Sequence, residues 1–163
     1  MTNFIAHYES PLGGMTMASD GTALIALKFD GTKSESYFSD GTSATTMLPV
    51  FDETRRWLDL YFSGEKPDFT PSLAPQGTPF QKRVWEILLA IPYGKTKSYG
   101  DVARRFPSKM SAQAIGGAVG HNPIGIIIPC HRVIGADGSL TGYGGGLDRK
   151  RWLLELEGLC LFS

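Results

Sequence analysis

Cys130 and His131 are adjacent in the sequence, and a cysteine beside a histidine can act as an activated nucleophile. The thiolate is the reactive form of cysteine, and a neighbouring basic group favours it. Residues 126–128 are three isoleucines, which predict a short buried strand that would carry Cys130 to a fixed place. The alternative is a core cysteine that packs as a small apolar side chain. On this pair alone core packing is the better interpretation, so the surrounding sequence has to decide.

The elements that would position this pair are mainly helical. Ser98 and Ser111 can each cap a helix, and two short helices in succession predict a helix-turn-helix. Thr78 and Pro79 predict the start of an earlier helix. We expect helices at about residues 79–91, 98–106, 111–120 and 148–157. The apolar face of the first helix is expected at Phe80, Val84, Trp85, Leu88 and Leu89.

The first part of the chain predicts a small sheet followed by a helix. Short β-prone runs separated by turn residues are expected to form strands at residues 4–9, 15–18 and 23–29. An apolar stripe over residues 48–62 predicts a helix, and the four prolines of residues 66–79 indicate a linker. We therefore predict an α+β protein with an N-terminal domain and linker over residues 1–76 and a C-terminal domain over residues 77–163.

The two predicted domains differ in charge, although the 163-residue chain has a formal net charge of zero. Residues 77–163 hold 11 Lys and Arg against 6 Asp and Glu, a balance of +5. Residues 1–76 hold 5 Lys and Arg against 10 Asp and Glu, a balance of −5. This asymmetry indicates that the second domain contacts a polyanion, with an ordinary fluctuation in charge as the alternative.

Cysteine usage and hydropathy suggest a cytoplasmic protein. The chain has two cysteines, Cys130 and Cys160, which lie far apart in the sequence and form no disulfide framework. No apolar run approaches the length of a membrane span, and the N-terminus lacks the pattern of a signal peptide. The three histidines and two cysteines are not spaced as metal ligands, so we expect no metal site.

The sequence around Cys130 closely resembles the active-site signature of the O6-alkylguanine-DNA alkyltransferases. The resemblance extends from about residue 77 to residue 158 in the same order and spacing, which argues against chance. It rests on the segments TPF (78–80), VW (84–85), IPYG (91–94), SY (98–99), IGGA (115–118), HNP (121–123), PCHRV (129–133), GY (142–143), WLL (152–154) and EG (157–158). The first part of the chain, with SPLG at residues 10–13, looks like the more variable N-terminal domain of that family.

This resemblance implies a fold and a reaction. The fold would be a small ribonuclease-H-like sheet-and-helix domain followed by a mainly helical domain with a helix-turn-helix. The reaction would be direct-reversal DNA repair, in which a methyl or other small alkyl group passes irreversibly from O6-alkylguanine, and also from O4-alkylthymine, to Cys130. Each molecule would act once, without a cofactor, on double-stranded DNA. We expect it to work as a monomer.

The resemblance also assigns roles near Cys130. It implies that a water bridges Cys130 to His131, that Glu157 orients the histidine, and that Asn122 braces the active-site turn. On spacing alone, Glu157 would be a solvated charge near a helix end and Asn122 an ordinary turn residue. We also expect the side chains of Cys130 and His131 to diverge, because neighbours on a strand point to opposite faces.

A guanine pocket is the second set of implied contacts. Tyr143 would line this pocket within a glycine-rich loop, and the Gly144 amide would reach the O6 atom. The carbonyls of Cys130 and Val133 would bind the exocyclic amine, and the Tyr99 hydroxyl would donate to the base. For Tyr99, the alternative from sequence is a partly buried aromatic side chain.

The third set of implied contacts is to DNA. Base chemistry inside a duplex requires a flipped nucleotide, and the resemblance implies that the helix at residues 111–118 enters the minor groove. Its contacts, together with Arg132, would be Ala112, Gln113, Ala114 and Gly116. Gln113 departs from the family, which usually has an arginine there to fill the gap left by the flipped base. Glutamine keeps a donor and an acceptor but lacks the charge and stacking plane of guanidinium.

Three alternative functions stay open. A DNA lesion-binding protein with weak or no transfer is one, although such relatives lack the active cysteine. A Cys-His-Glu hydrolase is another, which would need an oxyanion hole and would turn over many times. A transcriptional regulator is the third, and regulatory relatives usually add an N-terminal metal-binding sensor domain that we do not expect here.

Overall fold

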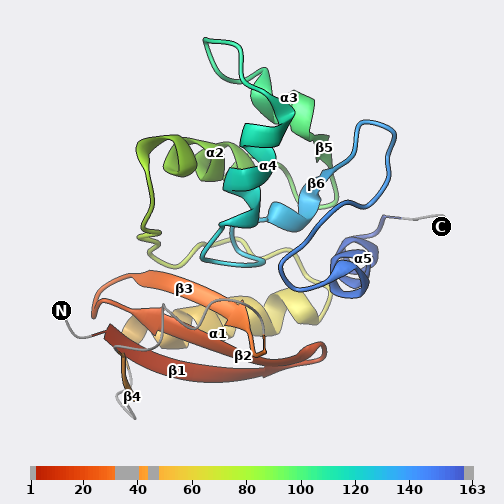
Figure 1. The fold of residues 1–163 in the computed structure, drawn as a ribbon. Helices are drawn as coiled ribbons and strands as arrows, with labels where there is room; N and C mark the ends of the chain where they lie inside the picture. Colours follow the sequence, from red (N-terminus) through yellow and green to blue (C-terminus); the bar gives the residue numbers. More distant parts are fainter. Residues whose placement is uncertain (1–2, 32–40, 44–47, 160–163) are drawn as a thin grey trace. The chain divides into compact units, whose positions relative to one another are not determined.

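The computed structural model describes residues 3–31, 41–43 and 48–159. The chain divides into two compact units, Met1–Gln76 and Gly77–Ser163. The first unit is drawn in red to yellow and the second in green to blue in Figure 1. The first is a small sheet with a helix and the second is mainly helical, so the predicted α+β class is confirmed.

The sheet of the first unit contains the strands β1 (Asn3–Ser10), β2 (Gly13–Ser19), β3 (Leu24–Phe29) and β4 (Gly41–Ser43). Their order is β3-β2-β1-β4, with β1 antiparallel to β2, β2 antiparallel to β3 and β1 parallel to β4. The three predicted strands are confirmed. The short strand β4 was not predicted, because its three residues show no β-prone pattern.

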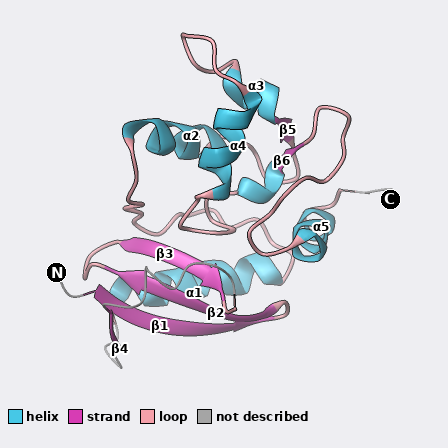
Figure 2. Ribbon diagram, in the orientation of Figure 1, coloured by secondary structure: helices cyan, strands magenta, loops and turns pink. Residues whose placement is uncertain are grey.

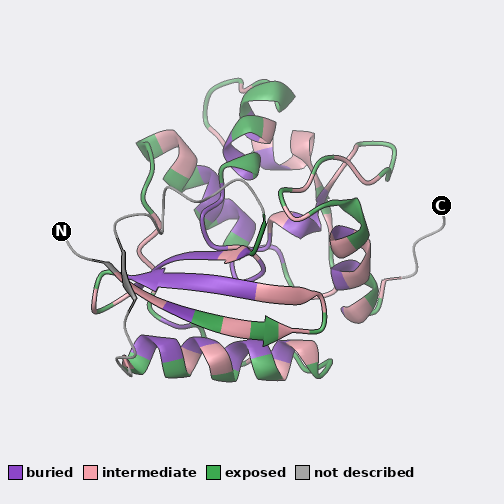
Figure 3. Cartoon of the chain, turned by 60° about the horizontal axis from the view of Figure 1, so that its bottom comes forward, coloured by how far each residue is buried: buried purple, intermediate pink, exposed green. Residues whose placement is uncertain are grey.

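Helix α1 (Pro49–Phe62) confirms the predicted helix of the first unit. Proline is suited to the first helical turn, because its fixed φ fits the helix and no N–H is needed there. The helix ends at Ser63, and Gly64 follows with a φ of 93°. Buried and exposed positions alternate along α1 at helical spacing, as Figure 3 shows. The buried side chains are Val50, Phe51, Thr54, Trp57, Leu58 and Tyr61.

The second unit contains the helices α2 (Pro79–Leu89), α3 (Tyr99–Ala103), α4 (Ala112–Gly120) and α5 (Leu147–Leu156). Two very short strands, β5 (Lys97–Ser98) and β6 (Val133–Ile134), pair in parallel. Figure 2 shows these strands beside a short helical turn, Cys130–Arg132, which has 3₁₀ geometry. This part of the fold places residues near 98 beside residues near 133.

The predicted helix starts are confirmed by their caps. Thr78 forms a capping box with Gln81, and Ser98 forms one with Asp101. Ser111 accepts a hydrogen bond from the Ala114 N–H at the start of α4. These side chains satisfy N–H groups that have no partner within their own helix.

Two details of the predicted helices are wrong. Helix α3 ends at Ala103 and not near residue 106. The Arg105 and Phe106 N–H groups donate to the carbonyls three residues earlier, so the chain forms turns and not α-helix before Pro107. The apolar face of α2 includes Ile87, which is buried, whereas Leu89 is 43% exposed. The face is therefore rotated slightly from the predicted stripe.

The core of the second unit joins α2, α4, α5 and the residues before Cys130. The Trp85 indole donates a hydrogen bond to the Ala118 carbonyl at 2.9 Å, which links α2 to α4 inside the core. The buried apolar side chains of this unit include Val84, Leu88, Val102, Ile115, Ile124, Leu153 and Leu154. This packing holds the elements that surround Cys130.

No helix in residues 3–31, 41–43 and 48–159 is long and apolar enough to cross a bilayer.

Candidate functional site

Cys130 follows a turn and not a strand, so the predicted strand at residues 126–128 is wrong. These residues form a hydrogen-bonded turn, and Ile126 has a φ of 68°, which is rare for a β-branched residue. The three isoleucines are nevertheless buried, as they would be in a core strand. Burial alone could not distinguish the two, because a buried turn and a buried strand need the same apolar side chains.

Asn122 holds this turn from inside. Its amide Nδ2 donates to the Ile128 carbonyl at 2.8 Å, and its Oδ1 accepts from the Ile124 N–H at 3.0 Å. Asn122 is only 2% exposed, so both bonds satisfy backbone groups that water does not reach. The side chain therefore braces the chain just before Cys130, which stabilises the unusual backbone at Ile126.

Cys130 and His131 differ in exposure because they begin a 3₁₀ turn. Successive side chains in such a turn are about 120° apart, so neighbours diverge without a strand. Cys130 is partly exposed, whereas His131 is fully buried. The expected divergence holds, but its geometric reason is the helical turn and not an extended strand.

A buried ionic cluster surrounds the histidine. Glu157 Oε2 lies 2.7 Å from His131 Nε2, and Arg132 donates to both carboxylate oxygens, from Nε at 2.8 Å and from Nη2 at 3.1 Å. The Gly94 N–H donates to Oε1 at 2.9 Å. Glu157 is therefore not a solvated charge: its side chain is fully buried and has four hydrogen bonds.

The same contacts set the protonation states of the cluster. Burial raises the pKa of Glu157, but the hydrogen bonds and charges of His131 and Arg132 outweigh burial and lower this pKa to about 2. Burial lowers the pKa of His131 below its ordinary value, against the opposing effect of Glu157. At neutral pH we therefore assign an anionic Glu157 and a neutral His131. Since a carboxylate can only accept, His131 Nε2 carries the hydrogen and Nδ1 is the basic nitrogen.

Arg132 belongs to the same buried cluster as Glu157. Its guanidinium is 9% exposed and binds Glu157, and Nη1 donates to the Ile91 carbonyl at 2.8 Å. The guanidinium also lies over the Tyr93 ring, 5.7 Å from its centroid. The expected role of Arg132 in DNA binding stays a prediction, and its guanidinium is already bound to a buried carboxylate.

Glu157→Gln is expected to destabilise the second unit by about 3–5 kcal/mol at neutral pH, because it leaves Arg132 buried without its counter-charge. The pKa of Glu157 is lowered from 4.5 to about 2. Its contribution to stability is thus present above about pH 4.5 and is lost as the pH falls towards 2. Urea unfolding of both proteins between pH 7 and pH 2 measures the difference. A difference that stays constant over this range would contradict the assignment.

Lys150 is a buried residue of the site that sequence reasoning missed. Its side chain is fully buried, and Nζ donates to the Val133 carbonyl at 2.6 Å and to the Thr141 carbonyl at 2.7 Å. Burial lowers the pKa of Lys150 to about 8, against the opposing effect of Cys130. A signal existed: Lys150 lies three and four residues before Leu153 and Leu154, on the buried face of α5.

The predicted pocket residues lie on the loop around residues 141–146 and on α3. Burial raises the pKa of Tyr143 well above its usual value, and the charge of Cys130 adds to this. Gly144 is exposed. The Tyr99 hydroxyl lies 2.8 Å from Thr141 Oγ1, so Tyr99 reaches the same loop from the start of α3. This hydrogen bond joins the start of α3 to a loop 42 residues later in the sequence.

Helix α4 presents the predicted DNA-contacting residues to solvent. Ala112, Gln113 and Ala114 are exposed and Gly116 is partly exposed. The buried side of the same helix is formed by Ile115, Ala118 and Val119. A helix that buries one face and presents mostly small side chains on the other can approach another molecule closely, so this face fits the predicted interface.

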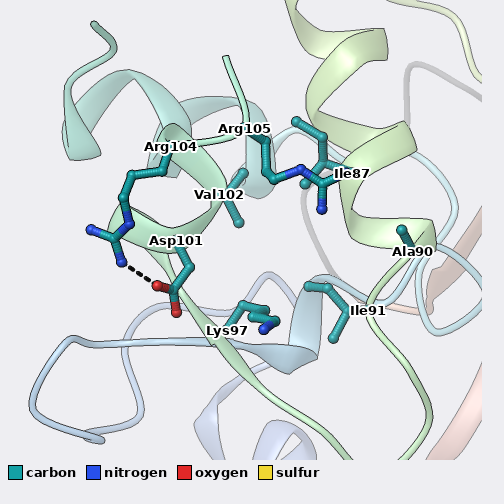
Figure 4. Close-up of a pocket in the computed structure, with 8 residues that line it drawn as sticks. All are labelled: Ile87, Ala90, Ile91, Lys97, Asp101, Val102, Arg104 and Arg105. Carbon is teal, nitrogen blue, oxygen red and sulfur yellow. Dashed lines mark hydrogen bonds and ion pairs between the residues drawn. The ribbon is translucent and has the colours of Figure 1, made fainter. Parts of the chain in front are cut away.

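A cavity of about 260 Å³ lies elsewhere in the second unit, between the end of α2, β5 and α3 (Figure 4). Arg104 is paired with Asp101 at its rim. The cavity is lined by Ile87, Ala90, Ile91, Lys97, Asp101, Val102, Arg104 and Arg105. These residues do not include the predicted alkyl acceptor or its relay, so the cavity is not the predicted pocket. Among the described residues no cluster of three or more His, Cys, Asp or Glu side chains is placed to hold a metal ion.

Comparison with known proteins identifies both units. Residues 79–159 match the 6-O-methylguanine DNA methyltransferase, DNA binding domain, and residues 4–75 match the 6-O-methylguanine DNA methyltransferase, ribonuclease-like domain. A protein of Mycobacterium tuberculosis named methylated-DNA–protein-cysteine methyltransferase is 48% identical over 154 residues, which cover 93% of this chain and 92% of that protein. A protein of the same name from Methanosarcina acetivorans is 45% identical over 157 residues, covering 96% and 99%.

Solved structures agree with the sequence comparison. The crystal structure of the M. tuberculosis O6-methylguanine methyltransferase has a TM-score of 0.83 at 45% identity and covers 95% of this chain and 92% of that one. The M. tuberculosis protein in complex with DNA gives a TM-score of 0.83 at 44% identity, covering 96% and 92%. Two matched domains, in the same order and over nearly the whole length, establish that this chain belongs to the 6-O-methylguanine DNA methyltransferase family.

Proposed function

We propose that this protein repairs DNA by direct reversal, transferring a methyl or other small alkyl group from O6-alkylguanine to its own Cys130. O4-alkylthymine is a second substrate, because it presents the same alkyl–oxygen bond on a base. The observation that carries the proposal is the partly exposed thiol of Cys130 beside the buried His131–Glu157 pair. The names of the relatives, methylated-DNA–protein-cysteine methyltransferase, support the same chemistry.

The buried cluster supports a specific proton path. Glu157 holds His131 Nε2–H, so that Nδ1 accepts the thiol proton of Cys130 through a bridging water. The thiolate attacks the alkyl carbon, the C–S bond forms, and the bond from that carbon to O6 breaks. The electron pair leaves with guanine, which takes a proton from the Tyr99 hydroxyl. The proton that His131 took from Cys130 then returns Tyr99 to its neutral form through solvent. The products are an S-alkylcysteine and an unmodified guanine, so atoms and charge balance without a cofactor.

The pocket supplies the groups that hold the base. Tyr143 lines it, the Gly144 N–H binds O6, and the carbonyls of Cys130 and Val133 accept from the exocyclic amine. The Tyr99 hydroxyl donates to the base and helps to neutralise the leaving group. The exposed loop around Gly144 and the positions of Tyr99 and Tyr143 support this arrangement.

Double-stranded DNA is the proposed partner, bound at its minor groove by α4. Ala112, Ala114 and Gly116 allow a close approach, and the alkylated nucleotide is flipped out of the stack. The exposed face of α4 and the structure of the M. tuberculosis protein in complex with DNA support binding to DNA. We propose a monomer in the cytoplasm, where a reducing environment keeps the acceptor cysteine in its thiol form.

Stoichiometry tests the proposal against a hydrolase. Incubation with an excess of duplex DNA that contains O6-methylguanine should add one methyl group per protein molecule, and peptide mass spectrometry should place it on Cys130. A Cys-His-Glu hydrolase would instead release product repeatedly and keep its mass. Repeated turnover, or methyl on Cys160, which lies outside the described residues, would overturn the proposal.

Gln113→Arg is expected to accelerate repair of duplex DNA by about tenfold, because it restores a cation and a stacking plane where the flipped base leaves a gap. Gln113 is exposed on α4, so the larger side chain fits without disturbing the core. Reaction with a free O6-alkylguanine base should change much less, since that substrate needs no flipping. Single-turnover rates on both substrates measure the effect. Equal duplex rates would mean that Gln113 already fills the gap.

A further inference from the structure

Thr141 connects three parts of the second unit. Its hydroxyl Oγ1 lies 2.8 Å from the hydroxyl of Tyr99, at the first residue of α3. Its carbonyl accepts from Lys150 Nζ in α5 at 2.7 Å. The same ammonium donates to the Val133 carbonyl at 2.6 Å, three residues after Cys130. A single threonine therefore joins the helix-turn-helix to the segment that carries the acceptor cysteine.

The backbone of Thr141 is fixed independently of its side chain. Lys150 is fully buried, and its two carbonyl acceptors hold the 141 loop and the start of β6 at one ammonium group. A charged donor gives stronger hydrogen bonds than a neutral one. Removal of the Thr141 hydroxyl should thus leave the loop in place, so that the hydroxyl can be tested separately from the loop.

The ring of Tyr99 faces Gly116 of α4, and its hydroxyl faces Thr141. A Cβ atom added at Gly116 of α4 would lie 3.8 Å from Tyr99 Cε1, which is ordinary van der Waals distance. Parallel pairing of Ser98 with Ile134 fixes the start of α3 beside the segment that follows Cys130. The backbone before Tyr99 is therefore tied to β6, and the Tyr99 hydroxyl is bonded to Thr141.

We propose that Thr141 is a positioning residue for alkyl transfer, which donates its hydroxyl hydrogen to the Tyr99 oxygen and thereby directs the Tyr99 hydrogen towards the base. This inference rests on the proposed function, in which Tyr99 donates to the alkylated base. Each hydrogen bond in such a chain polarises the next, so a tyrosine that accepts from Thr141 is a better donor to the leaving group. Thr141 acts through Tyr99 and does not itself contact the alkyl group.

Thr141→Val tests this role, because valine keeps the branched shape of threonine and removes the hydroxyl. We expect the single-turnover rate at saturating substrate to fall about three- to tenfold, the range for one neutral hydrogen bond. The apparent affinity for duplex DNA should change little. Thr141→Ser keeps a hydroxyl at the same place and should recover most of the rate. An unchanged or faster rate in Thr141→Val would overturn the proposal, a faster one indicating that Thr141 restrains the Tyr99 hydrogen.

A double-mutant cycle with Tyr99→Phe separates positioning from packing. Without the Tyr99 hydroxyl, Thr141→Val should produce no further loss of rate. If Thr141 only packs the loop, the valine variant should slow transfer equally in both backgrounds, which would also overturn the proposal. Ser139→Ala is the matched control. It also removes a hydroxyl from this loop, but that hydroxyl donates to nearby Asp137 and not to Tyr99, so the rate should not change. Failure of the unmodified protein to methylate Cys130 would instead refute the proposed function, so the two failures are distinguishable.

Discussion

Cys130→Ser is expected to abolish alkyl transfer, lowering the single-turnover rate by at least about three orders of magnitude. A serine hydroxyl is far less ionised than a thiol at neutral pH and is a weaker nucleophile, so the His131 relay cannot compensate. The substitution changes one atom at a partly exposed position, and the fold should therefore be retained. Single-turnover transfer from labelled O6-methylguanine DNA measures the loss.

Two controls make this result specific. Cys160→Ser should leave transfer intact, because the resemblance places no acceptor there. Binding of the Cys130→Ser protein to methylated duplex DNA should persist, since the exposed face of α4 is unchanged. If the Cys130→Ser protein transferred the alkyl group as fast as the unmodified protein, another residue would be the acceptor.

His131→Phe is expected to slow transfer by about 10²–10⁴-fold, the usual contribution of a positioned general base. Phenylalanine fills the buried imidazole site but cannot accept the thiol proton or donate to Glu157. DNA binding should change much less than the rate, because the ring is fully buried and does not reach the α4 surface. Single-turnover kinetics and DNA titration of the same preparation measure the two effects.

The pH dependence of the transfer rate provides a control for the role of His131. Burial lowers the pKa of His131 below 6.5, so in the unmodified protein His131 is neutral at pH 7. Its rate should fall as the pH decreases through that lowered pKa, because a protonated imidazole cannot take a proton. The His131→Phe protein should lack this acid limb. Unfolding by urea must show that the variant is folded, and an unchanged rate in a folded variant would exclude the relay.

Local sequence signals were sufficient for most of the secondary structure. The helix starts at Thr78, Ser98 and Ser111 could be predicted because a capping side chain bonds within its own three or four residues. The strands β1 to β3 could be predicted because turn residues separate them. The strand expected at residues 126–128 was wrong because burial and backbone direction are separate properties, and hydropathy reports only burial.

The acceptor cysteine and the family were recognisable from the sequence, since their signature lies mostly in contiguous segments. The roles of Glu157, Arg132 and Lys150 were of a different kind. Glu157 bonds to His131 across 26 positions of sequence and to Gly94 across 63. Spacing alone suggested a solvated glutamate, whereas the folded chain buries Glu157 with His131 and Arg132 as its partners.

Features that could be predicted from the sequence differ from those that could not in how far apart in the sequence the interacting residues lie. A cap, a turn or an amphipathic stripe is satisfied by neighbours in sequence, so residue types and their spacing are enough to predict it. A buried charge is tolerated only where distant segments bring its partners together. For this protein the sequence could therefore indicate the nucleophile, the helices and the family. Glu157 could be assigned to His131 only through the resemblance and not through spacing, and the ammonium of Lys150 that joins Val133 to Thr141 is a tertiary contact that no local pattern encodes.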